Sequence, residues 1–467
     1  MAILRVPNSA SQISGTIDQD LIVVPSGLSN MVTIYGLQGA DTVEFLGGDV
    51  SAKDVKVEAN GGPDQILFSG IVLGNGMIRG GAGGDLINFN SGTNKDITIQ
   101  AGDGNDTITV SGADLGDVNA GGGFDYVSYN AGHKFSANNK QYLLGAGKDT
   151  LSFADQEGSA SNIDNATVYG GGGNDLIEIK NSTSTNNFVV NGDAADANVY
   201  GNDLIDLQLS ANNGSFKGNG GRDTILISAE LGKDNEILGN AGRDSIVISA
   251  SFDGSDNSIG GGSGGDTIQI LNTMTASAHI TGGGGADSIY IDFTRSEIKG
   301  TNTLKGGQGS DTIDFDSTFS GTESTGLGHL IVFDQVSDST TTNSDQYIFR
   351  NNARGASSGT TMEIDTRSIA VPSQNYSIDV DGLTVSGGIA RFSAVTSLAE
   401  RVEVLDANLK EVGQYAVMDG LESDNAYFFM QGGSGDDLLV EVQNKQINVK
   451  HVSVTQNDIG LINFMIG

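Results

Sequence analysis

The sequence predicts an all-β protein: a parallel β-solenoid of about 21 residues per coil, followed by a β-rich C-terminal domain. Two observations predict the solenoid. A phrase of glycines closed by one aspartate recurs, as in GNGGRDTILIS from Gly218 and GNAGRDSIVIS from Gly239, 21 positions later. Apolar residues then alternate after each aspartate, which is the pattern of a strand with one buried face. Repetition at such a period is typical of stacked coils.

The first 34 residues lack the phrase but contain the strand-like runs IVV and MVTI. A solenoid needs an end coil that closes its core and protects its edge strands. We therefore expect residues 1–34 to form an N-terminal capping segment.

Residues 35–316 contain the repeat. Counting weaker copies at Asp64, Asp149 and Asp203, thirteen aspartates from Asp41 to Asp311 follow one another at intervals of 19 to 28 residues. An apolar residue such as Ile237 recurs before the glycines, and a pair such as Ile246 and Ile248 recurs after the aspartate. Each coil thus has one strand that enters the glycine turn and one that leaves it, joined on the far side by a polar loop.

The glycines fit a tight turn with positive φ angles, which a Cβ disfavours. The aspartates raise a charge problem. Carboxylates stacked once per coil, about 4.8 Å apart, repel one another. The residues alone leave two solutions open: a cation between the carboxylates, or a metal-free arrangement in which each aspartate caps its own turn.

The phrase G-G-x-G-x-D-x-U-x, with U a large aliphatic residue, resembles the calcium-binding repeat of the RTX (repeats-in-toxin) β-roll family over residues 36–316. The resemblance implies that Ca²⁺ is held by turn carbonyls and the aspartate, with successive turns sharing the ion. The implied ligand carboxylates are Asp85, Asp106, Asp125, Asp149, Asp175, Asp223, Asp244, Asp266, Asp287 and Asp311. The implied carbonyl ligands belong to Gly80, Ala82, Ala101, Asp103, Gly239, Ala241, Gly261, Ser263, Gly282, Gly284, Gly306 and Gln308.

The chain departs from the family in two respects. Family repeats usually run in tandem, whereas here one nonapeptide alternates with about twelve other residues, so we expect calcium along one edge only. Lys148, Arg222 and Arg243 stand immediately before aspartates. A cation there weakens an ion site unless it points outward, which is what we expect. The copies at Asp41 and Asp64 are imperfect, and so is the copy at Asp203.

Residues 317–467 lose the period and show longer β-type runs such as YIFR and AYFFM, with one late copy, GGSGDDLL, at 432–439. The ending NDIGLINFMIG is similar to the C-terminal signal for type I export in RTX proteins. There is no cysteine, and MAILRVPNSASQ does not read as a secretion signal. We expect an extracellular, cell-surface protein.

The charge balance excludes several partners. With 24 Lys plus Arg against 58 Asp plus Glu, the net charge of −34 excludes nucleic acid or an anionic membrane bound through a basic face. No apolar run reaches the roughly 18 residues of a membrane span, so we expect no membrane insertion.

No catalytic constellation stands out, and we expect no enzyme. The histidines His133, His279, His329 and His451 are scattered without an H-E-x-x-H zinc motif. GGSGG at Gly261 matches G-x-S-x-G, but Ser263 occupies the variable third place of the repeat.

The resemblance extends to RTX-type bacterial surface-layer proteins and implies self-assembly into a homo-oligomeric lattice or extracellular filament. The alternative is a calcium-stiffened adhesin that stacks Tyr126, Tyr169, Tyr200 and Tyr290 on cell-surface polysaccharide. A polysaccharide-active enzyme is a third class. An ice-binding array is not favoured, because the threonines after the aspartates, such as Thr224 and Thr267, lack matching partners two residues on.

Overall fold

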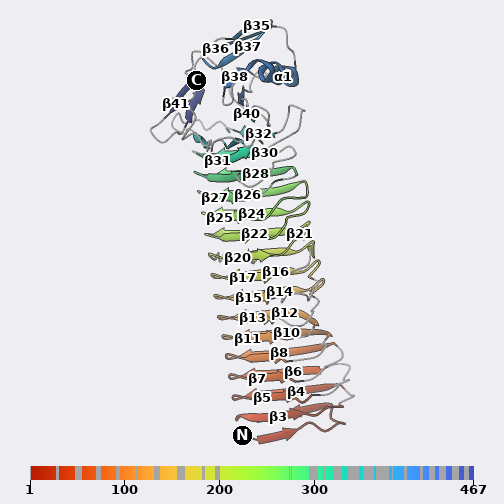
Figure 1. The fold of residues 1–467 in the computed structure, drawn as a ribbon. Helices are drawn as coiled ribbons and strands as arrows, with labels where there is room; N and C mark the ends of the chain where they lie inside the picture. Colours follow the sequence, from red (N-terminus) through yellow and green to blue (C-terminus); the bar gives the residue numbers. More distant parts are fainter. Residues whose placement is uncertain are drawn as a thin grey trace. The chain divides into compact units, whose positions relative to one another are not determined.

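The predicted parallel β-solenoid is confirmed. The computed structural model describes residues 2–27, 31–47, 55–69, 75–90, 95–111, 114–130, 137–154, 163–180, 185–194, 200–272, 274, 276–293, 303–308, 311–319, 329–334, 346–350, 362–363, 378–380, 382–393, 397–410, 414–419, 426–430, 438–443, 452–456 and 462–466. The chain divides into two compact units, Met1–Ala229 and Glu230–Gly467, which are described separately. Figure 1 shows the stacked strands and their labels.

The first unit consists of two parallel sheets, each with one strand per coil. The entering strands are β2 (Gln12–Ser14), β4 (Val32–Gln38), β6 (Val55–Gly61), β8 (Gly76–Ala82), β10 (Lys95–Asp103), β12 (Asp114–Gly122), β14 (Gln141–Ala146), β16 (Thr167–Gly172), β19 (Val189–Asp193) and β22 (Ser215–Gly221). The leaving strands are β1 (Ala2–Arg5), β3 (Asp20–Val24), β5 (Thr42–Phe45), β7 (Gln65–Phe68), β9 (Leu86–Phe89), β11 (Thr107–Val110), β13 (Tyr126–Tyr129), β15 (Thr150–Ala154), β17 (Leu176–Lys180), β20 (Leu204–Gln208) and β23 (Thr224–Ile227). A small third sheet pairs β18 (Thr185–Asn186) with β21 (Ala211–Asn212).

The second unit begins with the same architecture. Its entering strands are β24 (Glu236–Gly242), β26 (Asn257–Ser263), β28 (Ala278–Gly284) and β30 (Thr303–Gln308). Its leaving strands are β25 (Ser245–Ile248), β27 (Thr267–Ile270), β29 (Ser288–Phe293) and β31 (Thr312–Phe319); β31 also pairs with β33 (Gln346–Arg350) and, antiparallel, with β34 (Met362–Glu363).

A mixed sheet follows, in the order β32 (His329–Asp334), β40 (Leu438–Gln443), β39 (Ala426–Met430), β38 (Tyr415–Asp419), β37 (Ile389–Phe392), β36 (Leu383–Ser386) and β35 (Ile378–Val380). Helix α1 (Leu398–Asn408) packs Val402 and Leu405 into the core of this sheet, together with Leu409, which follows the helix as its C-cap. The apolar C-terminal run forms β42 (Ile462–Ile466), antiparallel to β41 (Val452–Gln456). In the late copy of the phrase, residues 432–437 lie outside the described residues.

The sequence phrase sets the register. Ile66, Ile87, Ile108 and Val127 occupy the same place in four successive leaving strands, pair in register, and are fully buried. A one-residue slip would turn every such side chain to solvent, so the apolar alternation fixes the stacking.

Aromatic side chains extend this core. Phe45, Phe68 and Phe89 stack in successive coils with ring centroids 4.3 and 4.4 Å apart. Tyr142 of an entering strand contacts Phe153 of a leaving strand edge to face, at 5.1 Å. The inward side chains of the two sheets therefore share one core, and their outward side chains form two opposite faces.

Among the described residues, no helix has the length and apolar character needed to cross a membrane.

Candidate metal-binding edge

The aspartates of the repeat lie where the glycine turn passes into the leaving strand, and every one is at most 3% exposed. In the first unit they are Asp41, Asp64, Asp85, Asp106, Asp125, Asp149, Asp175, Asp203 and Asp223; in the second they are Asp244, Asp266, Asp287 and Asp311. The three imperfect copies are as buried as the others. We call each set an aspartate column.

One oxygen of each carboxylate holds neighbouring coils together. The backbone N–H of Asp85 donates to Oδ1 of Asp106 at 2.7 Å. The same bond joins neighbouring aspartates from Asp41 to Asp223, and from Asp244 to Asp311, at 2.7–2.9 Å. The metal-free arrangement considered from the sequence, a cap on each aspartate's own turn, is therefore wrong for this oxygen. The bond runs to the preceding coil.

The second oxygen, Oδ2, is buried without a hydrogen-bond partner among the described residues. This holds for Asp41, Asp64, Asp85, Asp106, Asp125, Asp149, Asp175, Asp203, Asp266 and Asp287. Leaving a buried carboxylate oxygen unsatisfied is costly unless the group is neutralised by a proton or by a cation. The repeated, unpartnered Oδ2 atoms therefore make this edge a candidate cation site.

In most coils a glycine five residues before the aspartate makes room beside this oxygen, whereas the coils of Asp64, Asp106, Asp125 and Asp149 have Ala59, Ala101, Ala120 and Leu144 at that place. A Cβ added to Gly36 would lie 2.8 Å from Oδ2 of Asp41 and 2.6 Å from the Ala59 carbonyl oxygen of the following coil. At Gly282 the corresponding distances, to Oδ2 of Asp287 and to the Gly306 carbonyl, are both 2.5 Å. The cradle thus pairs an unsatisfied carboxylate oxygen with a carbonyl oxygen.

The predicted carbonyl ligands fall into two groups. Gly80, Ala101, Gly239, Gly261, Gly282 and Gly306 occupy the position five before an aspartate, and the carbonyls of Ala101, Gly261, Gly282 and Gly306 face the preceding coil's Oδ2. Ala82, Asp103, Ala241, Ser263, Gly284 and Gln308 stand two residues later. Of these, the carbonyls of Ala82, Asp103, Gly284 and Gln308 accept an N–H from the preceding turn at 2.6–2.7 Å. Carbonyls of the second group thus also join the coils.

Burial makes these carboxyl groups hold protons. Loss of water raises the pKa of Asp64, Asp85, Asp125, Asp175 and Asp287 to about 7, that of Asp149 to about 6, and that of Asp203 to about 8. The hydrogen bond to Oδ1 acts in the opposite direction but is the smaller effect. Near neutral pH a proton and a cation therefore compete for the same oxygen.

Asp20 begins the column and was missed in the sequence. Its N–H donates to Oδ1 of Asp41 at 2.7 Å, like the later members. Its own Oδ2 is satisfied by the Thr16 N–H at 2.5 Å and the Thr16 hydroxyl at 2.8 Å, and this N–H holds the pKa of Asp20 below its usual value. The sequence signals that could have identified Asp20 were Gly15, which stands five residues before it, and the spacing of 21 residues between Asp20 and Asp41.

Asp193 is a second buried carboxylate that the sequence did not indicate. It pairs in register with Gly171, in a turn that is interrupted before Gly201 resumes the phrase. Its Oδ1 accepts the Gly201 N–H and its Oδ2 the Gly220 N–H, both at 2.8 Å. Since both oxygens are satisfied by the protein, Asp193 anchors the interrupted turn and differs from the column.

The three cationic neighbours of the column are exposed. The side chains of Lys148, Arg222 and Arg243 lie on the outside of their turns, as expected from the sequence. Arg243 extends along the outside to the next turn, where its Nε donates to the Gly265 carbonyl oxygen at 3.5 Å.

The described residues contain no cluster of three or more His, Cys, Asp or Glu side chains suited to a metal ion. A metal on this edge would instead bind an Oδ2 and main-chain carbonyls, the all-oxygen environment that hard cations such as Ca²⁺ prefer. The orphaned Oδ2 atoms and the glycine cradles fit such an ion.

No family model matches the sequence, and no curated protein matches it. Among solved structures, one that matches this chain is the crystal structure of a hyperactive, Ca²⁺-dependent, β-helical antifreeze protein from an Antarctic bacterium. The two are 20% identical, the match covers 72% of this chain and 85% of that chain, and the TM-score is 0.34.

The outward positions after the aspartates do not form a threonine array. Thr107 and Thr109 of β11 pair in register with Leu86 and Asn88 on one side and with Tyr126 and Ser128 on the other. The threonines of one strand thus face other residue types on the neighbouring strands.

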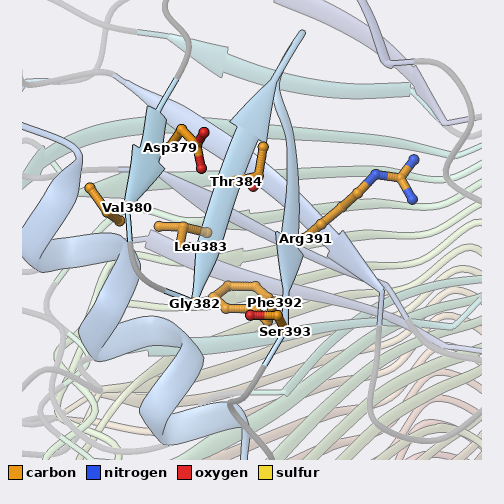
Figure 2. A pocket seen from close by; sticks show the side chains of 8 residues that line it. All are labelled: Asp379, Val380, Gly382, Leu383, Thr384, Arg391, Phe392 and Ser393. Carbon is orange, nitrogen blue, oxygen red and sulfur yellow. The ribbon is translucent and has the colours of Figure 1, made fainter.

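A surface pocket in the mixed sheet of the second unit is lined by residues of β35, β36 and β37, including Asp379, Thr384 and Arg391 (Figure 2). These three side chains form one row across the strands, and Arg391 extends away from Asp379. No buried polar group is directed into the pocket among the residues that line it, so it is not a candidate centre.

Proposed function

We propose that this chain is a secreted, calcium-dependent structural protein that assembles with copies of itself into a bacterial surface layer or extracellular filament. The observation that carries the calcium proposal is the column of buried Oδ2 atoms, several of which share a glycine cradle with a carbonyl oxygen. An ion supplies the positive charge that the described side chains do not place there.

Calcium suits these positions better than magnesium. Ca²⁺ accepts six to eight oxygen ligands in flexible geometry, whereas Mg²⁺ demands a near-ideal octahedron and keeps its waters. Carbonyls fixed by strand pairing cannot rearrange into an octahedron around each ion. Extracellular calcium modules bind with dissociation constants of about 10⁻⁴–10⁻³ M, which matches free calcium outside a cell. Ion binding then supplies folding free energy after export.

A structural role is supported by the repetition of the same buried carboxylate in successive coils. The carboxylates of the columns hold neighbouring coils together, and we propose no catalytic activity for this chain. Export by a type I route remains a proposal that rests on the resemblance of the C-terminal run to such signals.

A glycan-binding adhesin is the second candidate. It is favoured by exposed aromatic rings beside the turns: Phe124 is 65% exposed, Tyr126 43% and Tyr200 62%. Rings in such positions can stack on sugar faces.

Electron microscopy of the full chain with calcium, and after chelation, separates the two. Ordered sheets or fibres that dissolve on chelation support assembly. A dispersed protein that binds bacterial surface polysaccharide supports adhesion and contradicts assembly. Asp266→Asn should weaken calcium-dependent assembly. Asp256→Asn is the matched control, because Asp256 is exposed and has a positive φ of 66° that asparagine tolerates.

A further inference from the structure

The first unit presents two outer faces. The entering face consists of the outward side chains of β4, β6, β8, β10, β12, β14, β16, β19 and β22, and the leaving face of those of β5, β7, β9, β11, β13, β15, β17, β20 and β23. Parallel sheets are usually covered on both sides, yet the outward residues here are partly exposed, including Tyr126 and Leu204 on the leaving face. Faces of this kind are candidates for contact with another protein surface.

The entering face is cationic at two places. In the coils of Asp64 and Asp85, Lys56 Nζ lies 2.6 Å from Glu58 Oε1, and Arg79 Nη1 lies 3.0 Å from the same oxygen, so two cations share one carboxylate. Lys217 points outward from the coil of Asp223. Between these two places the face carries further acidic residues: Asp96, which pairs with Lys140 at 2.8 Å and lies in the coil of Asp106, and Asp117 in the coil of Asp125. The cations Lys56, Arg79 and Lys217 thus lie in other coils than Asp96 and Asp117.

The leaving face is anionic at two places. Glu44 points outward from the coil of Asp41. Glu178 and Asp206 are register partners in the coils of Asp175 and Asp203, and they share one cation, Lys180. On the leaving face the single charge therefore lies toward the N-terminal end of the first unit and the cluster toward its C-terminal end. On the entering face the order is reversed, because the cluster lies toward the N-terminal end and Lys217 toward the C-terminal end.

These positions match when two copies are aligned antiparallel, with the coil of Asp125 in one copy opposite the coil of Asp125 in the other. The coil of Asp223 then faces the coil of Asp41, which brings Lys217 of the entering face opposite Glu44 of the leaving face. The coils of Asp64 and Asp85 face those of Asp203 and Asp175, so the Lys56, Glu58 and Arg79 cluster meets Asp206 and Glu178.

The uncharged positions agree with the same register. Tyr35 of β4 falls opposite Leu226 of β23, and Met77 of β8 falls opposite Leu176 of β17. Near the middle, Thr98 of β10 falls opposite Ser152 of β15, and Asp117 falls opposite the exposed Tyr126.

We propose that the entering face of one copy packs antiparallel on the leaving face of a second copy, with Lys217 opposite Glu44. This inference rests on the proposed self-assembly and specifies its contact surface. Because the two surfaces differ, each added copy exposes a fresh entering or leaving face, and the stack grows without closing. Charge complementarity selects both the orientation and the register.

Charge reversal tests the contact. In calcium, Lys217→Glu and Glu44→Lys should each raise the critical concentration for assembly of the full chain roughly tenfold. An equimolar mixture of the two variants should assemble close to the wild-type concentration. In an alternating stack of the two variants, each contact pairs either the two substituted side chains or the two native ones, and both pairs have opposite charges. Lys233→Glu, the same charge change at an exposed turn of the second unit, is the control and should assemble as wild type.

Circular dichroism and melting of each variant verify that the fold is retained. If the wild type assembles but the two reversals assemble equally well, or the mixture fails to recover, this contact is wrong while self-assembly stands. If the wild type itself stays monomeric in calcium, the proposed function has failed.

Discussion

At the residue scale, the aspartate carboxylate does two different things with its two oxygens. Oδ1 accepts the N–H of the preceding coil's aspartate, and Oδ2 is buried without a hydrogen-bond partner among the described residues. The first oxygen stabilises the stack unconditionally. The second stabilises it only when a proton or a cation removes the negative charge.

Asp106→Asn separates these roles. Asparagine keeps the acceptor and can donate its amide N–H where Oδ2 was unsatisfied, so the metal-free protein should be as stable as wild type or about 1 kcal/mol more stable. The gain in melting temperature on adding calcium should shrink. Thermal melts with calcium and with chelator measure both effects. Asp256→Asn is the control, since its side chain is exposed and lies outside the columns; an Asp106→Asn protein with the full wild-type calcium gain would refute this role of Oδ2.

Leu37 has a backbone conformation that a β-carbon disfavours. It has φ = 86°, in the turn position where later coils have Gly81 with φ = 119° and Gly102 with φ = 121°. A non-glycine residue there costs of order 1 kcal/mol. Leu37→Gly should therefore raise the melting temperature, because Leu37 is also 38% exposed and loses little packing.

Gly102→Ala should do the opposite, because its Cβ would collide with the Gly81 carbonyl oxygen. Equal melting temperatures for both variants and wild type would show that the turn geometry is not strained as described.

At the element scale, the coils were predictable and the helix was not. The period, the alternation and the glycines fixed two strands per coil and the aspartate positions. Helix α1 begins with a capping box in which Ser397 accepts the Glu400 N–H and Glu400 accepts the Ser397 N–H. This S-x-x-E signal stood in the sequence, but the β-type runs around it dominated the interpretation.

The hydrogen bonds of the column also could not be read from sequence. Spacing shows that Asp85 and Asp106 share an edge, but not which oxygen bonds which coil. Likewise, the interrupted turn at Asp193 appeared only as a weak copy, because the residues between Asp193 and Gly201 break the phrase.

The first coil is closed by Thr16. Thr16→Val keeps the backbone donor to Asp20 but removes the hydroxyl, which should destabilise this coil by about 1 kcal/mol. Hydrogen exchange of the Ala2 amide, which donates to Asp20 Oδ1 at 2.8 Å, should accelerate. Amides of β11, far along the stack, should exchange unchanged. Faster exchange throughout the stack would mean that Thr16 does not act locally.

At the scale of the whole molecule, the columns couple stability to pH. The folded-state pKa values of about 6 to 8 exceed the ordinary 3.8, so the folded protein keeps protons that the unfolded chain releases. This stabilisation is complete below the ordinary pKa and is lost as pH rises through the folded values.

The metal-free protein should therefore melt at a lower temperature at about pH 8 than at about pH 5. The dependence should persist at high NaCl concentration, which screens the surface charge but not the buried column. Saturating calcium should reduce it, because the ion holds the carboxylates ionised. Melts across this pH range, with and without calcium, check the sign; a metal-free protein that gains stability toward pH 8 would contradict the buried-acid description.

The most direct measurement is a calorimetric titration of the metal-free full chain with CaCl₂ near neutral pH, repeated in buffers of different ionisation enthalpy. Several equivalents of calcium should bind, protons should be released because the carboxyl groups give them up, and MgCl₂ should produce far less heat. Absence of calcium heat, together with a melting temperature that chelator does not change, would contradict the claim that cations neutralise the aspartate columns.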